Sequence, residues 1–277
     1  MSAPYTLVAR KNRPTRIVAA GAARFGDGRF AVIAGPCSIE SRSQLGAAAQ
    51  GVCAAGAVML RGGAYKTRTS PYDFQGLGDE GVALMHEAAR ALEMPSVVEA
   101  LSHAHVDALI GRVTMIQIGA RGMQNIPLLQ HAARTGMPIL LKRGSAATLD
   151  EVLCAAEYIA LEGNMNIVLC ERGIRGFDRH TRNVFDLGGA LALKELTHLP
   201  VIADPSHALG RRDLIAPLTL AAAAAGLDGA IVEVHPQPAA ALSDAAQAID
   251  CETFAAIMAR LGALRELGAL DARIGAA

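Results

Sequence analysis

The sequence is poor in aromatic residues and carries no net charge. Tryptophan is absent, aromatic residues occupy 4% of the 277 positions, and 26 Lys and Arg residues balance 26 Asp and Glu residues. So few aromatic rings argue against a platform on which single-stranded bases stack. A net charge of zero argues against a surface dedicated to nucleic acid or to anionic lipid. We therefore expect neither nucleic acid nor a membrane as a partner.

Long apolar runs and paired cysteines are also missing. The longest apolar stretch, residues 218–226, is much shorter than the roughly 20 residues of a membrane-spanning helix. Residues 1–16 lack the apolar core of a signal peptide. Five scattered cysteines without a CxxC pair are typical of reduced thiols. These absences predict a soluble, cytoplasmic protein.

Short apolar runs alternate with stretches of helical spacing along the chain. In residues 149–161 the apolar positions recur every three or four residues, and Thr148 with Glu151 predicts a capping box at the start of that helix. The eight predicted strands are Ala31–Pro36, Val58–Gly62, Ser96–Ala100, Met115–Gly119, Pro138–Lys142, Asn166–Cys170, Pro200–Ala203 and Gly229–Val234. This number of repeats predicts a (β/α)8 barrel, although a doubly wound open sheet alternates in the same way. Alternation around Gly26-Asp27-Gly28 predicts a short β-hairpin that closes the bottom of the barrel.

Polar side chains follow every predicted strand, where a barrel of this kind carries its chemistry. Eight of them are cations: Arg61, Lys66, Arg68, Arg121, Lys142, Arg143, Arg172 and Arg175. Cations gathered at one mouth of a neutral protein indicate a small polyanionic ligand with phosphate and carboxylate groups. The alternative is a solvated ring of charges that pairs with surface acids.

A second group of strand-end side chains has the donor atoms of a metal site. Its members are Cys37, His207, Glu233 and Asp244. One sulfur, one nitrogen and two oxygen donors suit a divalent transition metal and leave positions open for a substrate. Taken singly, a cysteine after a strand is usually a buried apolar residue, and a histidine after Asp-Pro-Ser can cap a helix. The metal prediction therefore depends on the four residues lying together.

Several motifs in this order resemble those of 3-deoxy-D-arabino-heptulosonate 7-phosphate (DAHP) synthases of the type I-beta class. The matching segments cover most of residues 30–250 and include Ala34–Ser41, Leu60–Pro71, Ile116–Arg121, Leu140–Gly144, Cys170–Gly173, Asp204–His207, Val232–Pro236 and Ala241–Asp244. The resemblance implies an aldol-type condensation of phosphoenolpyruvate (PEP) with erythrose 4-phosphate and water, which gives DAHP and phosphate. This reaction is the first step of the shikimate pathway, which leads to the aromatic amino acids.

The resemblance also implies a role for each matching residue. The metal ligands of the family fall on Cys37, His207, Glu233 and Asp244, with Mn²⁺ expected and Co²⁺, Fe²⁺ or Zn²⁺ as alternatives. Positions that hold PEP fall on Arg61, Lys66, Arg121, Lys142 and Arg172. Positions that hold erythrose 4-phosphate fall on Arg68 and Thr69. Because it lies near both substrates by position, Lys66 is the candidate for proton transfer, with a metal-bound water as the alternative. Cys37 and His207 complete the catalytic set.

Thr67 departs from the family pattern, because a proline usually follows the lysine of this motif. A more flexible loop leaves open a related condensation of PEP with another phosphorylated aldose, including the 3-deoxy-manno-octulosonate 8-phosphate synthase reaction. In the arabinose 5-phosphate enzymes this motif usually has an extra residue between the lysine and the arginine. Arg68 stands only two residues after Lys66, so the resemblance favours the four-carbon substrate. A non-catalytic partner barrel is a further alternative, but such a protein should have lost a ligand or a cation of the motifs.

The expected organisation is one catalytic barrel over residues 1–277, with residues 1–30 as an N-terminal extension. We expect no fused regulatory or chorismate mutase domain, because about 30 residues flank the matching region on either side. Relatives lead us to expect a homodimer or homotetramer. A separate chorismate mutase is a further candidate partner.

Overall fold

Eight parallel strands close into a barrel in the computed structural model, which describes residues 4–266. The strands are β3 (Ala31–Gly35), β4 (Met59–Arg61), β5 (Ser96–Glu99), β6 (Met115–Ile118), β7 (Ile139–Lys142), β8 (Ile167–Glu171), β9 (Val201–Ala203) and β10 (Gly229–Glu233). Each neighbour in the chain is a neighbour in the barrel, and β10 closes it by pairing with β3. The predicted (β/α)8 barrel is confirmed, and this closure excludes an open sheet.

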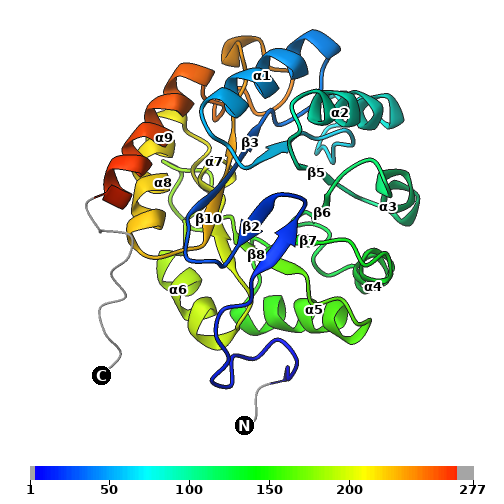
Figure 1. Cartoon of the computed structure of the whole chain (residues 1–277), viewed down its shortest axis with the longest axis vertical. Helices are drawn as coiled ribbons and strands as arrows, with labels where there is room; N and C mark the ends of the chain where they lie inside the picture. The colour runs from blue at the N-terminus through cyan, green and yellow to red at the C-terminus, as the bar shows by residue number, and fades with distance from the viewer. Residues whose placement is uncertain (1–3, 267–277) are drawn as a thin grey trace.

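Helices surround the strands (Figure 1). They are α1 (Arg42–Ala54), α2 (Asp79–Ala91), α3 (His103–Leu109), α4 (Ile126–Arg134), α5 (Leu149–Leu161), α6 (Leu187–Leu196), α7 (Pro205–Leu209), α8 (Ile215–Ala224) and α9 (Cys251–Glu266), with short 3₁₀ helices η1 (Arg212–Leu214) and η2 (Pro238–Ala240). The capping box of α5 is confirmed: Thr148 Oγ1 accepts from the backbone N of Glu151 at 3.2 Å, and the Glu151 carboxylate accepts from the backbone N of Thr148 at 2.7 Å. Within residues 4–266, no helix combines the length and the apolar character needed to cross a membrane.

The pleat of the strands divides the apolar residues into two layers. On β3, Ile33 points into the barrel, whereas Val32 and Ala34 pack against the surrounding helices. The interior layer also holds Met59, Val97, Met115, Leu140, Val168, Ile202 and Ile231. The barrel is therefore a filled core without a pore, and ligands must bind at one of its ends.

A β-hairpin of β1 (Val18–Ala20) and β2 (Ala23–Phe25) covers the N-terminal end of the barrel (Figure 1). Val18 and Phe25 are fully buried in the interior layer. The hairpin is confirmed, but its turn was predicted at the wrong glycines. Ala20 pairs with Ala23, so Gly21 and Ala22 form the tight turn, and Gly21 takes the left-handed conformation (φ 60°) that such turns need. Gly26-Asp27-Gly28 instead belongs to the connection to β3.

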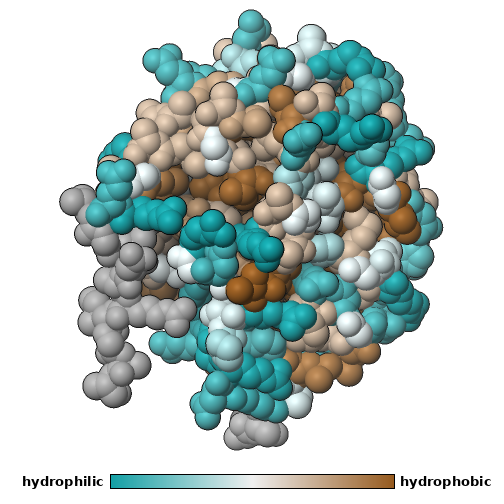
Figure 2. Space-filling model, viewed as in Figure 1, coloured by the Kyte–Doolittle hydropathy of each residue, from teal (hydrophilic) through white to brown (hydrophobic). Residues whose placement is uncertain are grey.

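The surface around the hairpin is mixed in character. Figure 2 shows hydrophilic side chains spread around this face, with smaller hydrophobic patches between them. Because the hairpin covers the interior layer at this end, we look for the site at the C-terminal ends of the strands.

Glu157 of α5 holds the N-terminal segment onto the barrel. Its carboxylate accepts hydrogen bonds from the backbone N atoms of Thr6, Leu7 and Val8 at 2.8–3.0 Å. Partial burial raises the pKa of Glu157, but these three donors outweigh it and hold the pKa below its usual range. Because the folded-state pKa is lowered, the stabilisation is complete above about pH 4.5 and is lost as the pH falls through the folded-state value.

We expect Glu157→Gln to lower the free energy of unfolding at neutral pH by roughly 1–3 kcal/mol, because an amide offers one acceptor oxygen and turns an NH₂ toward backbone donors. The measurement is the free energy of unfolding in urea, for wild type and variant, at two pH values. One is neutral, and the other is about one unit below the ordinary glutamate pKa. The difference should shrink at the lower pH. The control is Glu195→Gln on α6, an exposed position where the change should stay within about 0.5 kcal/mol. Equal stability of Glu157→Gln and wild type at neutral pH would show that the hydrogen bonds to Glu157 do not stabilise the fold.

Candidate active site

A cavity of about 730 Å³ opens at the C-terminal ends of the barrel strands. Cations dominate its wall: Lys66, Arg68, Arg121, Lys142, Arg172, Arg175 and Arg182. The acidic residues that line it are Asp73, Glu99 and Asp244. With seven cations against three carboxylates, the cavity suits a small polyanion.

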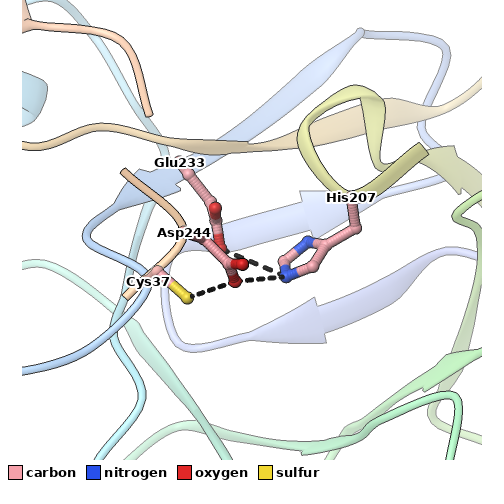
Figure 3. A group of neighbouring side chains, drawn as sticks. All are labelled: Cys37, His207, Glu233 and Asp244. Carbon is pink, nitrogen blue, oxygen red and sulfur yellow. Dashed lines mark hydrogen bonds and ion pairs between the residues drawn. The ribbon is translucent and has the colours of Figure 1, made fainter. Parts of the chain in front are cut away.

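Four side chains from separate parts of the chain converge at the edge of this cavity (Figure 3). Cys37 follows β3, His207 lies on α7, Glu233 ends β10 and Asp244 lies in the loop that follows. Their ligand atoms lie within 4.8 Å of one another. The thiol of Cys37 donates to Asp244 Oδ2 at 3.0 Å, and His207 Nε2 lies 3.2 Å from Glu233 Oε1. The sequence prediction that these four residues lie together is confirmed.

The backbone conformation of Gly35 determines where the chain leaves β3 and reaches Cys37. Its φ is 147°, and a Cβ at this position would lie 2.1 Å from the carbonyl oxygen of Arg61. Only glycine lets β3 and β4 approach this closely, and Cys37 then emerges two residues later at the mouth of the barrel.

Asp204 orients the imidazole of His207. Its Oδ2 atom lies 2.7 Å from His207 Nδ1, and a carboxylate can only accept, so Nδ1 carries the proton. Burial works against the charge of Asp204, but His207 and Lys142 hold its pKa well below the usual range. His207 Nε2 therefore points toward the carboxylates of Glu233 and Asp244, at 3.2 and 3.9 Å, and would offer its lone pair to a metal ion bound between them.

The chemistry of the four donors fits a divalent metal ion. Burial and the charge of Glu233 raise the pKa of Cys37 to about 12, so an ion that binds the thiolate must displace a proton. Partial burial raises the pKa of Asp244, but His207 and the Cys37 thiol outweigh it and lower the pKa to about 2. One sulfur, one imidazole nitrogen and two ionised carboxylates, aimed at one point, are a transition-metal donor set.

Arg61 is buried in contact with this cluster and is not among the residues that line the cavity. Its guanidinium donates to Glu233 Oε1 at 2.8 Å and to the carbonyl oxygen of Cys37 at 3.3 Å. Its Nε atom is buried and has no partner among residues 4–266. Gln247 donates to the other oxygen of Glu233 at 2.7 Å. Both oxygens of Glu233 are thereby fixed in direction.

The other residues predicted to hold PEP line the cavity. Lys66 Nζ donates to Cys37 Sγ at 3.0 Å, and Lys142 Nζ donates to Asp204. Arg172 is buried, and its guanidinium makes no hydrogen bond within the described part of the chain. Burial lowers the pKa of Arg172. Arg172 is therefore a partly dehydrated cation whose donors remain available to an anion in the cavity.

The two residues predicted to hold the aldose phosphate lie on the loop between β4 and α2. Arg68 donates to Ser243 Oγ at 2.7 Å, next to the cluster. Arg121 donates to the carbonyl oxygen of Thr67 at 2.8 Å and reaches Thr69 Oγ1 at 3.5 Å. The end of β6 thus supports this loop through Arg121.

Arg143 was wrongly predicted to belong to the mouth of the barrel. It is buried and donates to Glu171 at 2.8 Å and to Asp186 at 2.9 Å. Successive side chains of a strand point to opposite faces, so Lys142 faces the cavity and Arg143 faces the helix layer.

Several residues without a predicted role also contribute to the site. They are Glu99, Gln117, Arg182, Asn183, Ser243 and Gln247. Glu99 and Gln117 lie at strand ends, which is a usable sequence signal, and Gln117 donates to Glu99 at 3.1 Å. The others come from long loops, where spacing alone predicts no contact.

The fold and the site define a class of protein: a (β/α)8 barrel with a cation-lined cavity beside a four-residue cluster of metal-binding type. Residues 13–266 match the DAHP synthetase I family. The chain belongs to this family and is an enzyme of the DAHP synthase type, which confirms the resemblance seen in its motifs and is consistent with the type I-beta class.

Relatives extend this likeness over most of the chain. A phospho-2-dehydro-3-deoxyheptonate aldolase of Thermotoga maritima is 48% identical over 252 residues, which cover 91% of this chain and 75% of the relative. A crystal structure of the Thermotoga maritima DAHP synthase matches with a TM-score of 0.93 at 43% identity, over 97% of this chain and 79% of that one. A 2-dehydro-3-deoxyphosphooctonate aldolase of Acidithiobacillus ferrooxidans is 31% identical over 234 residues, 78% of this chain and 82% of the relative.

Proposed function

We propose that this chain condenses PEP with erythrose 4-phosphate and water to give DAHP and phosphate, in a metal-dependent reaction. The observation that carries the proposal is the cation-lined cavity that opens beside Cys37, His207, Glu233 and Asp244. Two phosphorylated anions repel each other, so a site that joins them must offset that repulsion with fixed cations. The Thermotoga maritima relative, a phospho-2-dehydro-3-deoxyheptonate aldolase, supports the seven-carbon product.

PEP is the ligand we place against Lys142, Arg172 and Arg121. Its phosphate and carboxylate require several directed N–H donors, and guanidinium groups supply them in pairs. Arg172 meets this need best, because it is buried and its donors have no partner within residues 4–266. Arg61 adds positive charge through its contact with Glu233. Arg68 and Thr69 would then bind the phosphate of the aldose on the loop after β4.

The carbon–carbon bond forms between C3 of PEP and the aldehyde carbon of erythrose 4-phosphate. The aldehyde oxygen takes up a proton and becomes a hydroxyl, water adds to C2, and the phosphate leaves as its bond to C2 breaks. A divalent ion on the four donors, Mn²⁺ in our proposal, would polarise the aldehyde carbonyl as a Lewis acid. The same donors would also suit Co²⁺, Fe²⁺ or Zn²⁺.

Lys66 is the residue we propose to supply the proton. Its ammonium lies 3.0 Å from Cys37 Sγ and lines the cavity, so it reaches the edge of the cluster where the carbonyl must lie. Burial works against its charge, but the neighbouring Cys37 outweighs this and raises the pKa of Lys66. Lys66 therefore enters the reaction as an acid, and the proton lost by the attacking water restores it.

A turnover assay tests the proposal. We expect phosphate release when the protein meets PEP and erythrose 4-phosphate with Mn²⁺, one phosphate for each PEP consumed. A chelator should abolish the release, and added Mn²⁺ should restore it. Arabinose 5-phosphate should give a kcat/KM at least about tenfold lower, since the spacing of Lys66 and Arg68 resembles that of the enzymes for the four-carbon substrate. The absence of phosphate release with every metal tried, or a preference for arabinose 5-phosphate, would contradict the proposal.

A further inference from the structure

One carboxylate oxygen joins the cation-lined cavity to the four-residue cluster. Asp204 Oδ2 accepts from Lys142 Nζ at 2.5 Å and from His207 Nδ1 at 2.7 Å. Its other oxygen, Oδ1, accepts from the backbone N of His207 at 3.0 Å and caps α7. Asp204 is fully buried and Lys142 nearly so. Lys142 reaches the cavity wall on one side, and His207 reaches Glu233 on the other.

We infer that Asp204 is a positioning residue that couples the two halves of the site, so that an anion bound at Lys142 raises the affinity of the cluster for a divalent cation. This inference rests on the proposed function, because it takes PEP and a divalent ion as the two ligands.

The coupling follows from the sharing of Oδ2. Away from water, the charge of Asp204 is divided between the ammonium of Lys142 and the N–H of His207. An anion in the cavity competes for the hydrogen bonds and charge of Lys142. More of the carboxylate charge then acts on the Nδ1–H bond of His207, and the Nε2 lone pair becomes a better ligand. By reciprocity, a cation at the cluster must strengthen anion binding at Lys142 by the same factor.

Direct attraction between the bound anion and the bound cation adds to this coupling. A variant that loses the shared oxygen should therefore lower the coupling without removing it. The part carried by Asp204 is the difference between wild type and variant.

Two substitutions at Asp204 separate the shared contact from the helix cap. In Asp204→Asn the side chain has one oxygen, so an NH₂ must face either the backbone N of His207 or the donors of Lys142 and His207. In Asp204→Ser a hydroxyl can still cap α7, but the shared carboxylate oxygen is gone. The matched control is Asp228→Asn, since Asp228 is also buried and accepts from a lysine, Lys194 Nζ at 2.7 Å, and from the backbone N of Val201 at 2.8 Å. That pair lies at the opposite end of β9.

The measurement is the dissociation constant of Mn²⁺ with and without saturating PEP. Electron paramagnetic resonance gives the concentration of free Mn²⁺ at each step of the titration. PEP should tighten Mn²⁺ binding to the wild-type protein by at least about fivefold, and Mn²⁺ should tighten PEP binding by the same ratio. Both Asp204 variants should lower that ratio by at least about threefold, and Asp228→Asn should leave it unchanged within error. Thermal unfolding of each variant confirms that it is folded.

If saturating PEP leaves the dissociation constant of Mn²⁺ unchanged in the wild-type protein, the inference is wrong. This test requires no variant. Folded Asp204 variants with the wild-type ratio would overturn it as well. In both cases PEP and Mn²⁺ still bind, so the proposed function stands. A wild-type protein that does not bind PEP at all would overturn the proposed function and the inference together.

Discussion

Replacing Cys37 with alanine should lower the affinity for Mn²⁺ by more than about 100-fold, and turnover should fall at least as far. Loss of a residue that merely orients a metal ligand costs roughly 10–100-fold in affinity or activity, and Cys37 is proposed as a ligand itself. The substitution also removes the thiol that donates to Asp244 at 3.0 Å and the acceptor of Lys66 Nζ. The cluster would retain three donors without the thiolate that favours a transition metal.

The fold should tolerate this change. Cys37 is buried and small, and alanine fills most of its volume, so the free energy of unfolding should fall by about 1 kcal/mol. Metal titration and thermal unfolding of the same preparation separate the two effects. The control is Cys53→Ala on α1, a cysteine that packs beside the core and should affect neither metal affinity nor turnover. Wild-type Mn²⁺ affinity and turnover in Cys37→Ala would refute Cys37 as a ligand.

The barrel could be predicted from the sequence because its signals are local and repeated. Each strand is a short apolar run, and the helix after β7 carries its own start signal in Thr148 and Glu151. Eight such units leave few ways to bury both faces of the strands. The turn of the hairpin escaped prediction because two glycine-containing segments, at Gly21 and at Gly26–Gly28, compete for one turn. The pairing of Ala20 with Ala23 decides between them, and it goes with the burial of Val18 and Phe25 in the barrel interior, which the local sequence does not specify.

The residues of the site that lie at strand ends could be predicted from the sequence. Cys37 and Glu233 come at or just after strand ends, and closure of the barrel brings β3 and β10 together. The strand-end rule failed for Arg143, because adjacent residues of one strand face opposite sides. It also could not show that Arg61 contacts Glu233 and does not line the cavity, because that depends on how the ends of β4 and β10 pack together. The contact of Ser243 with Cys37 Sγ, at 3.2 Å, depends on a loop whose course the sequence does not encode locally.

Lys66→Met should lower kcat by about 10²–10⁴-fold, the range for loss of a positioned general acid. The variant loses both the charge that offsets two phosphates and the proton that the aldehyde oxygen needs. Lys66→Arg separates the two roles. A guanidinium keeps the charge, but its pKa is too high for it to give up a proton at neutral pH.

Steady-state kinetics of the two variants therefore distinguish proton transfer from charge alone. Lys66→Arg should bring the KM for PEP back toward the wild-type value, whereas kcat should stay within about tenfold of that of Lys66→Met. The aliphatic stem of Lys66 passes close to Gly63, where a Cβ would lie 2.8 Å from Lys66 Cδ. The space beside this stem is narrow, so the wider side chain of arginine should be displaced slightly. We therefore expect a small residual increase in the KM for PEP in Lys66→Arg. Recovery of kcat in Lys66→Arg would show that the charge suffices. The proton would then have to come from another group, and Lys66 would be a residue that binds the substrates only.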